Sequence, residues 1–220
     1  MILAETERAA AAVTPDWQAH RVVRAGMPVT RAHQVSEDLF VLCQGWAFRF
    51  MNLPSGRRQI LNFILPGDVF SISSIFEDRV PHSVRALTDV QICGMTRTEV
   101  QSRLFASPSN LRTLGKLCSE SEGAADNLLA VVGHCSAEER IAHLLLHLTT
   151  RIAAQTVIKD ETYPFPLRQQ HIADAVGLTS VHISRSLGSF RERGILSLAG
   201  GMLRVLDLPE LERLGSLQVR

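Results

Sequence analysis

From residue 108 onward, apolar and small residues recur at helical spacing in two series with an interval of seven. The first series is Leu111, Cys118, Ala125 and Val132, and the second, offset by three, is Leu114, Ser121, Leu128 and Cys135. This a/d pattern predicts a long helix over 108–135 whose stripe needs a partner. A second copy of the chain is the simplest partner and would give a parallel two-fold homodimer. The alternative is that the helix packs on a neighbouring domain.

Residues 15–107 follow another pattern, in which short, partly alternating apolar runs are separated by Gly and Pro. The runs lie at 39–50, 57–65 and 82–95, with turn signals at 55–56 and 66–68 and a short helical turn at 71–76. Short strands separated by such closely spaced turns predict an all-β sandwich or a barrel-like roll. Residues 1–14 are expected to form a helical or unstructured tail.

Helical spacing returns after Ser136. This serine can be the N-cap of the helix, because Glu138 and Glu139 follow it as acidic residues of the first turn. This helix should end near residue 154, and the polar, Pro-containing stretch 156–166 is expected to be a connector.

Two short helices with a tight turn are predicted over 167–196. Ile172, Ala173 and Val176 form one apolar face, and Gly177 supplies the backbone freedom that ends the first helix. Thr179 or Ser180 can cap the second helix, whose polar side chains are free to face outward. This is the plan of a helix-turn-helix, in which the second helix lies in the DNA major groove. An ordinary packed helical hairpin is the alternative.

Residues 195–206 follow the two helices and are predicted to form two short strands around Ala199–Gly201. This hairpin is in the position of the wing of a winged helix. Asp207 is placed to cap a last helix through Leu214. The expected fold class is therefore α+β: a tail over 1–14, a jelly-roll-like β-roll over 15–107, a dimerisation helix over 108–135 and a winged helix-turn-helix over 136–220.

Composition narrows the class of protein only slightly. A net charge of +1 over 220 residues, with 45% hydrophobic residues, is that of a globular chain without a strongly basic character. Residues 165–204 nevertheless carry five Arg against two acids, which suits contact with phosphates. The four scattered cysteines suggest a reduced, cytoplasmic protein, and neither a secretory signal nor a membrane span is expected.

The order of these parts, with the runs LPGDVF, SVRALTD and IADAVGLTSVHISRSL, resembles the CRP/FNR family of bacterial transcription regulators. The resemblance covers about 15–208. It implies a cyclic-nucleotide-binding-like roll and a homodimer on a palindromic operator of double-stranded DNA, with half-sites one helical turn apart. It also implies that an effector sensed in the roll sets the pose of the DNA-binding domains, and that an activator would contact RNA polymerase.

On the second helix, Arg185 matches the family's DNA-contacting Arg, a side chain suited to guanine. Ser180 and Val181 stand where cAMP-responsive members have Arg and Glu, so neither well-known half-site is implied. Val181 is suited to contact a thymine methyl. The residues expected to bind DNA are Arg168, Gln169, Gln170, Thr179, Ser180, Val181, His182, Ser184 and Arg185.

The roll lacks the charged anchors that cyclic-nucleotide binders of the family have. Ser71-Ile72 replaces the Gly-Glu pair, and the phosphate-binding Arg falls near Pro81-His82. The residues left to form an effector pocket are Ser71, Ser73, Ser74, His82, Ser83 and Arg85. We therefore do not expect the roll to bind cAMP or another cyclic nucleotide.

Other cofactors have no motif that selects them. The two cysteines in the roll, Cys43 and Cys93, are too few for an iron–sulfur cluster. Haem remains open, with His20, His33, His82 and Cys93 available, and so does another small effector. His143 and His147 share a helix face but lack a third metal ligand. No cofactor and no metal is expected.

Catalysis has no support in the sequence. A cupin-like metal enzyme would need a His-X-His pair, which is absent. The sequence therefore predicts a DNA-binding transcription regulator that is not an enzyme, with an effector-gated regulator as the nearest alternative.

Overall fold

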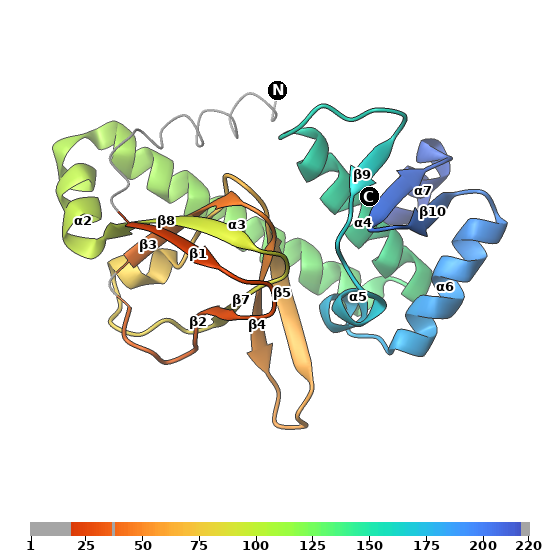
Figure 1. Ribbon diagram of the computed structural model, residues 1–220, viewed down its shortest axis with the longest axis horizontal. Helices are drawn as coiled ribbons and strands as arrows, with labels where there is room; N and C mark the ends of the chain where they lie inside the picture. The colour runs from red at the N-terminus through yellow and green to blue at the C-terminus, as the bar shows by residue number, and fades with distance from the viewer. Residues whose placement is uncertain (1–18, 37, 217–220) are drawn as a thin grey trace. The chain divides into compact units, whose positions relative to one another are not determined.

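The computed structural model describes residues 19–36 and 38–216. The predicted tail over 1–14 lies outside these residues. Contacts divide the chain into two units, the first ending at Gly123 and the second beginning at Ala124, so the division falls within one long helix (Figure 1). Each unit has its own core.

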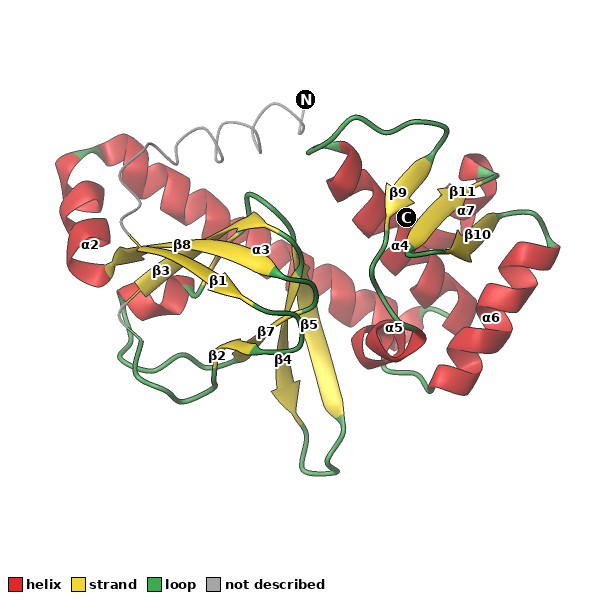
Figure 2. Ribbon diagram, viewed as in Figure 1, coloured by secondary structure: helices red, strands yellow, loops and turns green. Residues whose placement is uncertain are grey.

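The first unit is a β-roll of two antiparallel four-stranded sheets. One sheet has the order β1-β8-β3-β6 and the other β2-β7-β4-β5 (Figure 2). The strands are β1 (Ala19–Val23), β2 (Pro28–Thr30), β3 (Asp38–Gln44), β4 (Ala47–Asn52), β5 (Arg58–Ile64), β6 (Val69–Phe70), β7 (Ser83–Ala86) and β8 (Val90–Thr96). The predicted roll and its turn at Ser55-Gly56 are confirmed, since that pair lies between the paired strands β4 and β5.

The core of the roll lies between the two sheets. Phe40, Leu42 and Ile92 point into it from one sheet, and Ala47, Ile64, Val84 and Ala86 point into it from the other; all are buried. Alternation along each strand places these side chains on the same face, which is why the apolar runs predicted the sheets.

A second small core covers the far side of the first sheet. The 3₁₀ helix η1 (Ile72–Ile75) and the helix α2 (Arg97–Ala106) bring Ile75 and Val100 against Met95. The helical turn at 71–76 is confirmed, but α2 was not predicted. Its one buried side chain is Val100, so its sequence carries almost no helical pattern, and its start is fixed by a capping box between Thr96 and Glu99.

The long helix α3 (Pro108–His134) adds Leu114 to this second core. The predicted helix is therefore confirmed, but Leu114 is a correction to the predicted dimer stripe. It is buried in its own chain, because α3 begins beside α2 and η1, and the seven-residue spacing cannot distinguish this contact from one with a second copy.

The expectation of reduced cysteines is wrong for two of the four. Cys43 and Cys93 form a disulfide between the neighbouring strands β3 and β8. The pair is separated by 50 residues in sequence, and the ladder places Val41 opposite Cys93, with an irregularity between Leu42 and Gln44. Only the strand pairing brings the two side chains together.

The second unit is a winged helix. Its elements are α4 (Ala137–Ala153), β9 (Thr162–Pro164), α5 (Gln169–Val176), α6 (Ser180–Glu192), β10 (Leu196–Ala199), β11 (Met202–Val205) and α7 (Leu208–Gly215). The capping box of Ser136 and Glu139 and the N-cap of α7 at Asp207 are confirmed. The connector 156–166 is partly a strand, because β9 pairs with β11 and buries Tyr163.

Candidate nucleic-acid interface

The turn between α5 and α6 fixes the angle of the two helices. Gly177 has a φ of 73° and a ψ of 26°, the left-handed conformation that a residue without Cβ adopts at little cost. The Leu178 amide then donates to the Ala173 carbonyl at 3.1 Å, which closes the end of α5. Thr179 is the N-cap of α6, and its hydroxyl accepts from the His182 amide at 3.3 Å. Thr179 therefore positions α6, and a role for it in binding DNA stays a prediction.

The two faces of α6 differ sharply. Ile183, Ser186 and Phe190 are buried against the unit's core. The opposite face of its first two turns is exposed and consists of Val181, His182, Ser184 and Arg185. The Arg185 guanidinium has no ion pair within the described part of the chain. Such a surface has a cation, two polar groups and an apolar group available to a ligand.

Ser180 and Gln170 are engaged with each other rather than free. The Ser180 hydroxyl donates to Gln170 Oε1 at 2.8 Å, and Gln170 Nε2 donates to the buried carboxylate of Asp174 at 2.6 Å. These bonds connect the start of α6 to α5. To bind DNA directly, as predicted, either side chain would have to share or give up one of them.

The start of α5 presents a second exposed surface. Arg168, the residue before α5, and Gln169 and Gln170 in its first turn are all exposed. The Arg168 amide donates to His171 Nδ1 at 3.0 Å, which fixes the entry of the chain into α5. Amides and side chains at a helix start suit phosphate oxygens, as the sequence predicted for these three residues.

The local excess of Arg is smaller than the sequence suggests. Arg193 pairs with Glu138 at 3.1 Å and with Glu210 at 2.8 Å. Glu210 also pairs with Arg213 at 2.6 Å, and the hydrogen bond from Arg213 is the main cause that lowers the pKa of Glu210 to about 2. Arg193 is therefore engaged in ion pairs within the unit. Arg191 is exposed and takes part in neither of these pairs.

The predicted wing is confirmed as the hairpin of β10 and β11. Gly200 and Gly201 have φ values of 58° and 75°, and Leu198 lies opposite Leu203 in the ladder. The Phe165 amide donates to the Gly201 carbonyl at 2.7 Å, so β9 holds the hairpin at its tip. Arg204 is exposed on β11.

The effector residues predicted in the roll are not gathered into one site. The Ser74 hydroxyl donates to the carbonyls of Asp38 and Ser71, each at 2.7 Å, and Ser83 Oγ accepts from the Ala32 amide at 3.0 Å. Arg85 stacks over the Phe50 ring at 5.3 Å. Ser83 and Phe50 are cross-strand partners. Ser83, Arg85 and Phe50 therefore lie on the face of their sheet that points away from the roll's core.

Ser71, Ser73 and His82 are half-buried. Ser71 adopts a left-handed φ of 62° before η1. The structure gives these residues no common ligand site, so the predicted effector pocket stays a prediction.

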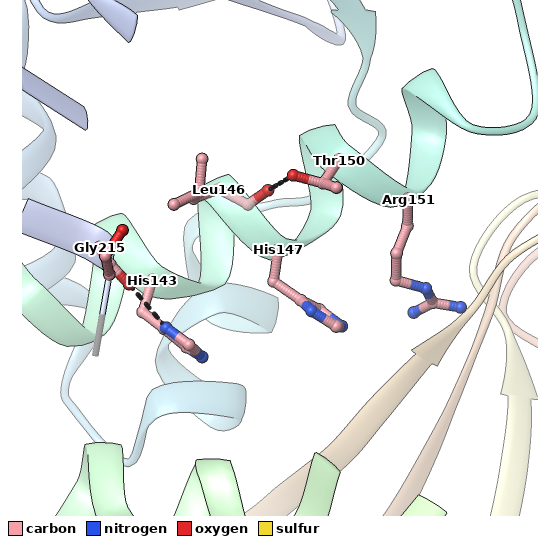
Figure 3. A pocket seen from close by; sticks show the side chains of 7 residues that line it. His143, Leu146, His147, Thr150, Arg151 and Gly215 are labelled. Atoms are coloured by element: carbon pink, nitrogen blue, oxygen red, sulfur yellow. Dashed lines mark hydrogen bonds between the residues drawn. The ribbon is translucent and has the colours of Figure 1, made fainter. Parts of the chain in front are cut away.

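His143 and His147 line a hollow of about 350 Å³ in the second unit, with Leu146, Thr150, Arg151, Gly215 and Ser216 (Figure 3). The ring of His143 is not free, because its Nδ1 lies 2.7 Å from the Gly215 carbonyl and joins α4 to the end of α7. Among the described residues, no group of three or more His, Cys, Asp or Glu side chains is arranged to hold a metal ion.

A β-roll followed by a long helix and a winged helix-turn-helix with an exposed recognition face defines a DNA-binding transcription regulator. Two family models match the chain: the cyclic nucleotide-binding domain over residues 20–107 and the Crp-like helix-turn-helix domain over residues 139–214. The chain belongs to the CRP/FNR family of transcription regulators.

Relatives and solved structures agree with this assignment. The nitrogen fixation regulation protein FixK of Bradyrhizobium diazoefficiens is 28% identical over 87% of this chain and 80% of its own length. The transcriptional activatory protein AadR of Rhodopseudomonas palustris is 27% identical over 83% of this chain and 75% of its own length. The structure of FixK2 from Bradyrhizobium japonicum has the same fold, with a TM-score of 0.83 at 22% identity over 90% of this chain and 98% of that one.

Within the described residues, no helix is long and apolar enough to cross a membrane.

Proposed function

We propose that the chain acts as a homodimer on a palindromic operator, with α6 of each copy in the major groove of one half-site. The observation that carries the proposal is the exposed face of α6, on which Arg185, without an ion pair among the described residues, lies beside Val181, His182 and Ser184. A helix fits the major groove, and an Arg there can donate two hydrogen bonds to guanine O6 and N7. Arg168 and the start of α5 would bind the phosphates that flank this contact.

The homodimer is supported by the side chains that α3 leaves exposed. Leu111 is 60% exposed, Leu129 73% and Val132 38%, and Cys118, Ser121 and Ala125 are exposed with them. A long helix with this much uncovered apolar surface gains free energy when another helix covers it. Leu128 is half-buried and lies on the same stripe. The small residues in the middle of the stripe would let two copies of α3 approach closely.

The half-site is expected to differ from those of relatives that carry Glu at the position of Val181. A carboxylate accepts a hydrogen bond from cytosine, whereas Val can only contact an apolar group such as the thymine methyl. RNA polymerase would be a further partner if the protein activates transcription.

A selection from randomised palindromes, followed by fluorescence anisotropy on the selected duplex, tests the DNA contact. Arg185→Ala should weaken binding to the selected site by about 1–3 kcal/mol and relax the preference at one base pair. Arg191→Ala is the control, since an exposed Arg at the far end of α6 should affect all sequences equally. Unchanged affinity and preference in Arg185→Ala would refute the assignment of α6.

Sedimentation velocity tests the dimer separately. Leu128→Glu should give a monomer with poor operator binding, because the interface would bury an unpaired charge. Ser119→Glu adds the same charge at an exposed position outside the stripe and should remain dimeric. A dimeric Leu128→Glu protein would rule out α3 as the interface.

A further inference from the structure

Three side chains form a chain of hydrogen bonds from α5 to the start of α6, which we call the Asp174 relay. Gln170 Nε2 donates to Asp174 Oδ1 at 2.6 Å, and the Ser180 hydroxyl donates to Gln170 Oε1 at 2.8 Å. Asp174 is buried, Gln170 is exposed and Ser180 is half-buried. The relay therefore leads from the interior of the winged helix to the first residue of the helix that is proposed to read DNA.

The direction of each bond in the relay follows from the carboxylate at its buried end. A carboxylate only accepts hydrogen bonds, so the atom of Gln170 beside Asp174 is the amide nitrogen. The amide oxygen then lies beside Ser180, and because this oxygen also only accepts, the Ser180 hydroxyl has to donate. A serine hydroxyl has a single proton, and here that proton is used inside the protein.

Ser180 is therefore left with lone pairs only. Gln170 is its one hydrogen-bond partner among the described residues, so the part of Ser180 that is open to solvent can accept a hydrogen bond but cannot donate one. Phosphate oxygens also only accept, and they cannot bind this hydroxyl. In the major groove the donors are the amino groups of adenine N6 and cytosine N4, whereas guanine and thymine present acceptors.

We propose that Ser180 selects an amino base, adenine or cytosine, at one position of each half-site, and that Asp174 acts as a positioning residue through Gln170. The selection rests on the proposed function, because it requires α6 in the major groove. Ser184 lies one turn further along the exposed face, and no described residue bonds to its hydroxyl. Its hydroxyl can both donate and accept, so only Ser180 carries a rule for the class of base.

Fluorescence anisotropy on duplexes that differ at single positions of the selected half-site tests this rule. The position read by Ser180 is the one whose base preference changes in Ser180→Ala. There the parent protein should bind adenine or cytosine roughly three- to tenfold more tightly than guanine or thymine, the worth of one neutral hydrogen bond. An analogue without the amino group, purine for adenine or 2-pyrimidinone for cytosine, should remove this advantage. In Ser180→Ala the amino base and its analogue should bind equally.

Asp174→Asn tests the positioning role with a side chain of the same shape. An asparagine both donates and accepts, so the amide of Gln170 can turn over and Ser180 is then free to donate outward. Binding should become equal within about twofold for every base at this position, while the guanine preference at the position read by Arg185 should remain. A purely structural role of Asp174 would instead weaken binding to all sequences alike. Ser189→Ala removes a hydroxyl from the far half of α6 and should change neither affinity nor preference.

The outcomes distinguish this rule from the proposed function. If Arg185→Ala leaves affinity and preference unchanged, α6 does not read DNA and both are wrong. If Arg185→Ala weakens binding, but Ser180→Ala changes no position or the changed position prefers guanine or thymine, the rule alone is wrong. Full retention of the amino-base preference in Asp174→Asn would overturn the relay. Gln170→Ala frees the same proton at an exposed position, and takes the place of Asp174→Asn if circular dichroism shows that variant to be unfolded.

Discussion

Replacing Gly215 by Ala should loosen the DNA-binding unit, because the end of α7 lies directly against the backbone of α4. A Cβ at Gly215 would stand 2.8 Å from the Ala142 carbonyl oxygen, 2.9 Å from its carbon and 3.0 Å from the His143 nitrogen. All three are main-chain atoms that cannot turn away. The end of α7 would have to retreat by roughly half an ångström to reach ordinary contact.

That retreat would stretch the 2.7 Å contact between His143 and the Gly215 carbonyl. Forcing a methyl into a packed region costs about 1–3 kcal/mol, and weakening the hydrogen bond adds up to about 1 kcal/mol. The lower entropy of Ala in the unfolded chain returns about 0.4–1 kcal/mol. The net loss should be about 1–3 kcal/mol, which lowers the melting temperature of a unit of this size by several degrees.

Gly188→Ala is the matched control. Gly188 lies inside α6, and a Cβ there would meet nothing within 4 Å, so Ala should stabilise the helix by up to about 1 kcal/mol. Calorimetry measures the two changes, and hydrogen exchange of the α4 amides assigns the transition to the second unit. Equal or greater stability of Gly215→Ala would refute the close approach of α7 to α4.

Three further predictions concern the same unit. Thr179→Ala should destabilise it by about 1 kcal/mol in denaturant unfolding, because the N-cap of α6 is lost, whereas Thr179→Ser should retain most of the stability. Phe190→Ala should cost about 3–5 kcal/mol and abolish operator binding, since this ring is fully buried; a cooperative, DNA-binding variant would contradict the burial. The pKa of Glu210 falls from 4.5 to about 2 on folding, so its stabilising contribution should be complete above pH 4.5 and lost as the pH falls towards 2. Melting curves between pH 2 and 7 should lose part of this dependence in Glu210→Gln, and an unchanged profile would show that the bonds to Arg213 do not persist in solution.

Features that depend on neighbours in sequence could be predicted from the sequence alone. Gly177, the N-cap Thr179 and the alternation of buried and exposed positions on α6 act within a few residues of each other. The N-cap at Ser136, the wing turn at Gly200 and the long helix are local in the same sense. Local backbone preference and helical period are enough to place such features, which is why the sequence alone predicts the exposed face of α6.

Features that depend on strand pairing and on packing between distant segments were decided by the tertiary structure. Spacing alone could not reveal that Leu114 is covered by its own chain or that Cys43 meets Cys93 across a ladder. The Asp174 relay has the same origin, because the packing of α5 against α6 brings Gln170 to Ser180. A serine at the start of a helix is expected to offer both a donor and an acceptor to solvent, and only the packing of the two helices shows that its proton is used inside the unit.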